Sequence, residues 1–82
     1  MPNDEADPRT RLCEAILQHL RTHAFAADTQ EGIVKSWLPA TGFADAPEHI
    51  DAVLEEMTRR RWLRRHTLPD GRVLYKRGEA PL

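Results

Sequence analysis

Residues 50–77 read IDAVLEEMTRRRWLRRHTLPDGRVLYKR, and the spacing of their apolar side chains changes once along this stretch. Between Ile50 and Met57 the apolar residues lie three and four positions apart, which is the spacing of one face of an α-helix. The Asp-x-x-Glu pair of Asp45 and Glu48 is typical of a helix start. The sequence therefore predicts a helix from Asp45 to about residue 60 or 61.

The second half of the stretch has the pattern of a β-hairpin. Two short runs that mix apolar and basic residues, 62–68 and 72–75, lie on either side of Pro69-Asp70-Gly71. Proline presets the backbone for the first central position of a turn, and glycine accepts the left-handed position that follows. We therefore predict a β-hairpin over residues 62–77. A lone hairpin is marginal in water, so helices must cover one of its faces.

Two more helices are predicted before this stretch. Asp7 and Pro8 suit an N-cap and a first helical position, and they open a helix over 8–23. An extended connector over 24–27 leads to Asp28, which opens a second helix with Glu31 three residues later. Pro39 ends that helix, and Gly42 marks a turn. The two apolar faces consist of Leu12, Ile16, Leu17 and Leu20, and of Ile33, Val34, Trp37 and Leu38.

The order helix, helix, helix, hairpin predicts an α+β fold that is mostly helical. The chain has 82 residues, a length typical of a single domain. We expect an acidic flexible tail over 1–7, one domain over 8–77 and a flexible tail over 78–82. Three short helices against a two- or three-stranded sheet form a winged-helix architecture with a C-terminal hairpin wing.

The run Leu54-x-x-Met57-x-x-Arg60-x-Trp62-Leu63-x-Arg65, followed by Asp70-Gly71-Arg72-x-x-Tyr75, resembles the end of a winged helix-turn-helix domain of the MarR and PadR type. The resemblance implies a third helix that enters the core, an apolar pair that opens the first wing strand, and Asp-Gly-Arg at the wing tip. It covers about residues 50–77 by motif and 8–77 by element order. Two features depart from the family. Arg61 stands where glycine commonly allows a left-handed exit, and the linker over 39–45 is longer than the usual turn.

Composition and motifs give no support to several classes of function. The single cysteine, Cys13, cannot form a disulfide within the chain and is interpreted as a small core residue.

The acidic start is unlike a secretory signal, and no apolar run approaches the ~20 residues that span a bilayer, so a cytoplasmic location is expected. His19 and His23 lie four residues apart, but no third ligand follows at motif spacing. We expect no metal, cofactor, catalytic residues or small-molecule substrate, and no membrane association.

Charge is unevenly distributed along the chain. Residues 1–58 carry 11 acidic and 4 basic side chains, whereas residues 59–77 carry 8 basic ones and a single acid. Contact with nucleic-acid phosphates is one interpretation of this basic cluster, and contact with an acidic protein partner is a second. A solvated face is the third, because bases complement a helix C-terminus, Glu55–Arg59 and Glu56–Arg60 are favourable pairs, and charges protect hairpin edges. The candidate nucleic-acid-binding residues are Arg59, Arg60, Arg64, Arg72 and Lys76.

The outward face of the third predicted helix is acidic. In DNA-binding winged helices this face enters the major groove, where its N-terminal half lies nearest the bases. Carboxylates facing phosphates without balancing bases oppose such binding. This face could instead contact a protein, and Trp37 could add an aromatic anchor, although a core position for Trp37 is the alternative. The candidate protein-interaction residues are Glu48, Asp51, Glu55 and Trp37.

Two functions therefore remain open at this point. The chain is either a small DNA-binding transcriptional regulator that contacts phosphates through its basic wing, or a protein-interaction adaptor that uses the acidic helix or the wing. No residue constellation favours an enzyme. We also expect a monomer, because regulators of this type dimerise through additional helices that the sequence does not show.

Overall fold

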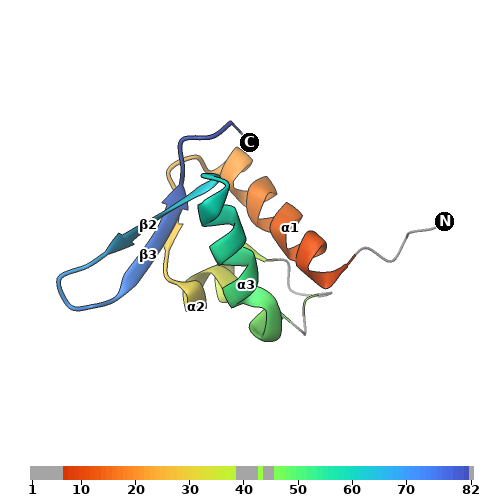
Figure 1. Ribbon diagram of the computed structural model, residues 1–82, viewed down its shortest axis with the longest axis horizontal. Coiled ribbons are helices and arrows are strands. Elements are labelled where there is room, and N and C mark those ends of the chain that lie inside the picture. Colours follow the sequence, from red (N-terminus) through yellow and green to blue (C-terminus); the bar gives the residue numbers. More distant parts are fainter. Residues whose placement is uncertain (1–6, 39–42, 44–45, 82) are drawn as a thin grey trace.

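The computed structural model describes residues 7–38, 43 and 46–81. Its fold is α+β and mostly helical, with helices packed beside one another and a hairpin that projects from them (Figure 1). The strands of the described residues form an antiparallel sheet in the order β1-β3-β2. The elements are α1 (Pro8–Thr22), β1 (Ala27–Asp28), α2 (Gln30–Gly32), the π-helical turn η1 (Ile33–Trp37), α3 (Ala46–Arg59), β2 (Leu63–Thr67) and β3 (Val73–Arg77).

The first helix begins as predicted. The Asp7 carboxylate accepts a hydrogen bond of 3.0 Å from the Arg9 N–H, and Pro8 occupies the first turn, where it costs no backbone bond. The prediction for the second helix start was wrong. Asp28 lies in β1 opposite Tyr75, so its backbone is committed to the sheet. Thr29 is the cap instead, because its hydroxyl accepts from the Gly32 N–H at 3.1 Å.

The second helix widens after its first turn. From Ile33 the backbone follows a single π-helical turn, a form that proteins use in short pieces. This turn buries Ile33 and Trp37 and leaves Val34 half-buried, and Leu38, directly after it, is also buried. The positions where we expected the helix stop, the turn and the next cap, Pro39, Gly42 and Asp45, lie outside the described residues.

The core lies between α1, α3 and the base of the sheet. Ile50, Val53, Leu54 and Met57 are all buried, which confirms the predicted apolar face of α3. They meet the buried face of α1, while Leu63 and Tyr75 extend the core onto the sheet. The buried face of α1 consists of Leu12, Ile16, Leu17 and Leu20, as predicted.

The chain leaves α3 through a left-handed residue. Arg61 has φ of 65°, the conformation for which glycine is favoured at this position. The Trp62 N–H donates to the Met57 carbonyl at 3.0 Å, and the Arg61 N–H donates to the Thr58 carbonyl at 3.0 Å. These two bonds form a Schellman motif, which satisfies carbonyls of the last helical turn. The helix exit is therefore the ordinary one, although an arginine makes it.

The predicted hairpin is confirmed, and the sheet of the described residues has a third strand, β1, whose position we did not predict. The Gly71 N–H donates to the Leu68 carbonyl at 2.9 Å, and Gly71 takes the left-handed position with φ of 93°. β1 adds to the far side of β3, in a segment we had interpreted as a connector. The expected tail is also bonded at its start, because the Gly78 N–H donates to the Trp62 carbonyl at 2.9 Å.

Replacing Arg61 with glycine should stabilise the fold. A side chain in the left-handed region costs about 1 kcal/mol, and part of that gain is offset by the greater freedom of glycine in the unfolded chain. We expect Arg61→Gly to raise the free energy of unfolding by roughly 0.5 kcal/mol in urea titrations. The control is Glu55→Gly in the right-handed part of α3, which should lower it. A lower stability for Arg61→Gly would contradict this account of the helix exit.

Candidate binding surface

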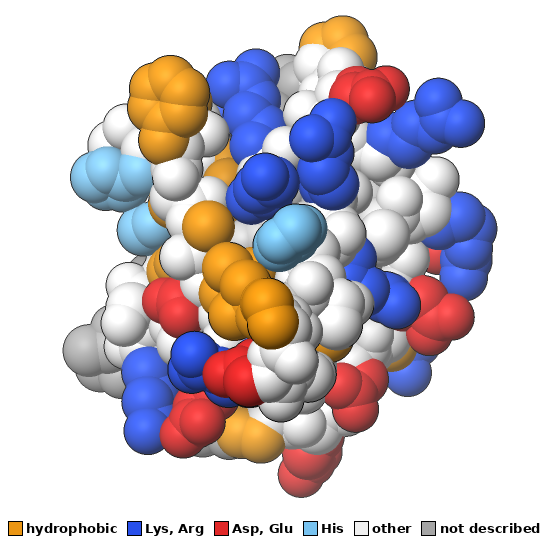
Figure 2. Space-filling view, turned by 90° about the vertical axis from the view of Figure 1, so that its left-hand side faces the viewer, with side chains coloured by type: hydrophobic (Ala, Val, Ile, Leu, Met, Phe, Trp, Pro, Cys, Tyr) orange, Lys and Arg blue, Asp and Glu red, His pale blue; other side chains and the backbone are white. Residues whose placement is uncertain are grey.

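The hairpin presents three basic or titratable side chains on the sheet face turned away from the core. Successive strand residues point to opposite faces, and Leu63 and Tyr75 mark the buried face. Arg64, His66 and Lys76 therefore lie on the opposite face, which we call the basic sheet face. Figure 2, which looks onto the hairpin end of the molecule, shows Lys and Arg side chains gathered mainly in its upper half and acidic ones mainly below.

Two cations lie directly opposite each other on the basic sheet face. Arg64 pairs with Lys76 in the register of β2 and β3. Like charges at directly opposite positions destabilise a sheet. Glu79 offsets this in part, because its carboxylate lies 3.4 Å from the Arg64 guanidinium. Lys76 forms no ion pair with any described residue, so the pair retains an excess of positive charge.

The arginine at the hairpin tip is held by its neighbour. Arg72 Nε lies 2.9 Å from Asp70 Oδ2, and the Arg72 backbone N–H donates to Asp70 Oδ1 at 3.0 Å. The backbone hydrogen bond is the main reason that the pKa of Asp70 is lowered, and the Arg72 side chain adds to it. Both side chains are more than half exposed, so this is a weak surface pair. Any ligand that Arg72 contacted at the hairpin tip would therefore also lie close to the Asp70 carboxylate.

The other two candidate arginines lie at the end of α3 and share one acid. Arg60 Nε is 2.6 Å from Glu56 Oε2, as predicted from the spacing, and Arg59 also pairs with Glu56 rather than with Glu55 as we expected. The hydrogen bond from Arg60 lowers the pKa of Glu56. The Arg60 guanidinium also lies 5.3 Å from the centre of the Trp62 ring. The positive charges of Arg59 and Arg60 are thus partly neutralised by the Glu56 carboxylate.

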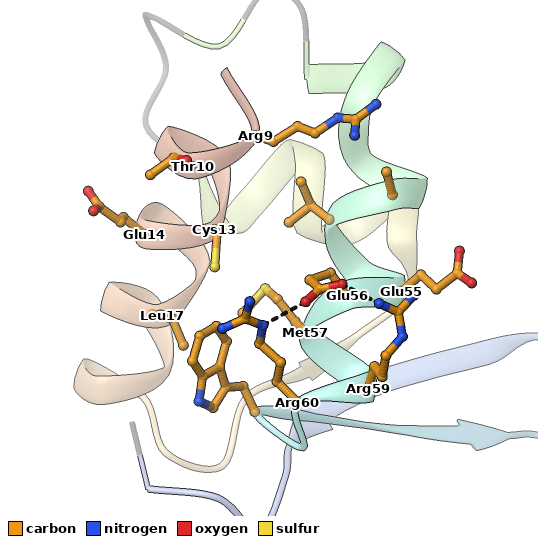
Figure 3. A pocket seen from close by; sticks show the side chains of 13 residues that line it. Arg9, Thr10, Cys13, Glu14, Leu17, Glu55, Glu56, Met57, Arg59 and Arg60 are labelled. Atoms are coloured by element: carbon orange, nitrogen blue, oxygen red, sulfur yellow. Dashed lines mark hydrogen bonds and ion pairs between the residues drawn. The ribbon is translucent and has the colours of Figure 1, made fainter. Parts of the chain in front are cut away.

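These arginines border a groove between α1 and α3 that the sequence did not reveal. Figure 3 shows Cys13 and Leu17 pointing into it from α1, with Met57 and the Glu56–Arg60 pair on the side of α3. Its volume is about 670 Å³. Burial raises the pKa of the Cys13 thiol, which is half-buried there. The charged residues of the lining are three bases and three acids, Arg9, Arg59, Arg60, Glu14, Glu55 and Glu56, so the groove favours neither sign of ligand.

The candidate protein-interaction residues divide into two groups. Glu48, Asp51 and Glu55 are exposed on α3, as a surface role requires. Trp37 is only 6% exposed and belongs to the core, where the His19 ring stacks on it with ring centres 4.7 Å apart. Trp37 therefore occupies a core position, which was the alternative interpretation from the sequence. Its side chain offers little surface to a partner.

One exposed aromatic was missed by the sequence reasoning. Phe25 is 99% exposed, in the turn that the Ala26 N–H closes by donating to the His23 carbonyl. The signal was present in the sequence, because Phe25 fits neither of the helical patterns on its two sides. Phenylalanine is enriched in protein interfaces, but single exposed apolar side chains are also common on protein surfaces.

Among the described residues, no three His, Cys, Asp or Glu side chains gather as a metal ion would require. The helices that the structure describes include none with the length and apolarity to cross a membrane. Neither family models, nor curated proteins, nor solved structures yielded a match to this chain.

The His19–Trp37 contact should make folding sensitive to acid. Burial, with a smaller effect of His23, lowers the pKa of His19 below its ordinary value of about 6.5. The unfolded chain therefore takes up the proton first, so stability is full at higher pH and is lost as the pH falls below about 6.5. Urea titrations of wild type at neutral and acidic pH should show this loss, and His19→Gln should reduce it. The control His66→Gln should retain the wild-type loss, and an unchanged loss in His19→Gln would exclude His19 as the cause.

Proposed function

We propose that this chain is a winged-helix module that binds an acidic segment of another protein through its β-hairpin. The described residues form three helices, with α2 and η1 counted as one, followed by a hairpin, and this order supports the winged-helix assignment. The left-handed exit at Arg61 and the buried Leu63 at the start of β2 are further support, because the wing of that fold begins with an apolar residue after such an exit. In this assignment α3 corresponds to the recognition helix, and β2 with β3 corresponds to the wing.

The observation that carries the proposal is the opposition of Arg64 and Lys76 on the basic sheet face. A hairpin gains nothing in stability from two cations at directly opposite positions, so their arrangement suits an anionic ligand. His66 lies on the same face of β2, two residues from Arg64, and widens the surface available to carboxylates. A protein segment with several carboxylates would relieve the repulsion at this face.

The charge of α3 favours protein over DNA as the partner. Its exposed positions Glu48, Asp51 and Glu55 would face the phosphates if the helix entered a groove, and phosphate neutralisation supplies most DNA affinity. The arginines at the end of the helix do not balance them, because Glu56 binds both Arg59 and Arg60. A partner that approaches the hairpin alone avoids this acidic row.

Nucleic-acid phosphates are the second candidate ligand, and the hairpin charge is the observation that favours them. Residues 61–77 carry six basic side chains and one acid. Such a surface would bind the backbone of a duplex without reading its bases, and the binding would weaken steeply with salt.

Amide NMR titrations with two probes test the proposal. One probe is a short peptide of alternating glutamate and valine, and the other is a random-sequence DNA duplex, each at low and near-physiological salt. We expect the peptide to shift amides of residues 61–79 at both salt concentrations, and the duplex to do so at low salt only. A duplex that binds more tightly than the peptide at physiological salt would overturn the proposal.

A charge reversal separates binding from folding. Lys76→Glu places a carboxylate opposite Arg64, so it should raise the free energy of unfolding by roughly 0.2–1 kcal/mol while it abolishes the peptide-induced shifts. Arg21→Glu, an equal change of charge at an exposed position of α1, is the control and should leave peptide binding intact. If Lys76→Glu bound the peptide as wild type does, the basic sheet face would not be the binding surface.

A further inference from the structure

We propose that the acidic partner segment binds as an added strand along the free edge of β2. This inference rests on the proposed function and names its mode of binding. β3 lies between β1 and β2, so in the described part of the chain β2 has a neighbouring strand on one side only. Strand addition to an open sheet edge is a recurrent mode of peptide recognition, in which backbone hydrogen bonds supply affinity and alternate side chains supply specificity.

The register shows which backbone groups of β2 remain available. The Leu68 N–H donates to the Arg72 carbonyl at 2.7 Å, and the Gly78 N–H donates to the Trp62 carbonyl at 2.9 Å. Hydrogen-bonded pairs alternate with non-bonded pairs along an antiparallel ladder. Arg64 and His66 therefore direct their backbone groups toward β3. The intervening residues, Arg65 and Thr67, direct their N–H and C=O groups to the free edge.

The side chains along this edge are accessible and define the chemistry of the partner. Every β2 residue after Leu63 is exposed. Arg64 and His66 lie on the basic sheet face, and Lys76 stands beside them on β3. A strand added next to β2 would place every second side chain on this face. The matching partner is an extended segment with carboxylates at alternate positions.

The opposite face of the edge tolerates small or apolar side chains between those carboxylates. Arg65 lies there with its guanidinium 5.7 Å from the centre of the Tyr75 ring, and it forms no ion pair with any described residue. Its aliphatic stem and the Thr67 side chain would contact the intervening residues of the partner. Unlike a bound phosphate, such a strand must also use the outward backbone groups of β2, and this requirement makes the mode testable.

A proline at the free edge provides the test. Thr67→Pro removes an N–H that points away from β3, so the ladder with β3 keeps its bonds, and proline is tolerated at edge positions of this kind. Thr67→Ala removes the side chain and keeps the N–H. With the peptide of alternating glutamate and valine, we expect Thr67→Pro to weaken binding by about tenfold and Thr67→Ala to bind as wild type does. Equal binding by all three proteins would overturn strand addition.

Hydrogen exchange of the unmodified protein keeps the test independent of how Thr67→Pro folds. Addition of the peptide should slow amide exchange at Arg65 and Thr67, which are outward, more than at Arg64 and His66, which already bond to β3. Hairpin shifts without this protection would mean that only side chains bind the peptide, which overturns strand addition and leaves the proposed function standing. If the peptide causes no hairpin shifts and the duplex does, the proposed function itself fails.

Discussion

The chain leaves α3 through Arg61, which has φ of 65°. The N–H groups of Arg61 and Trp62 donate hydrogen bonds to carbonyls of the last helical turn. This exit determines how β2 meets the core, because strand side chains alternate and a shift of one residue would invert them all. With the exit as it stands, Leu63 enters the core and Arg64 points away from it. The charge distribution of the hairpin surface thus depends on a backbone conformation several residues earlier.

Much of the fold could be predicted because the informative patterns are local. The spacing of Ile50, Val53, Leu54 and Met57 identified α3, and Pro69-Asp70-Gly71 identified the hairpin turn. β1 could not be predicted in this way, because two residues carry no periodicity and the strand exists only through its pairing with Tyr75 and Lys76. The helix cap is Thr29 instead of Asp28 for the same reason. Asp28 has the more typical cap side chain, but its backbone pairs with Tyr75 in the sheet.

The candidate surface was predictable in composition but less so in arrangement. Sequence showed that the bases gather after residue 58, yet it could not show that Glu56 binds two arginines or that Arg64 faces Lys76. Those facts depend on rotamers and on strand register, which long-range packing determines. The groove beside Cys13 arises from how α1 and α3 meet, so no local pattern predicts it. Phe25 differs, because its failure to fit either neighbouring helical pattern was a local signal of its exposure.

The open edge of β2 also bears on how copies of the molecule behave toward each other. Unpaired backbone groups can bond to any strand, including the same edge of a second copy. Such a pairing would bring arginines of the two copies close together on both faces of the edge, and their like charges oppose it. Because counter-ions screen that repulsion, its effect weakens as the ionic strength rises. The basic side chains of β2 thus act against edge-to-edge pairing of two copies.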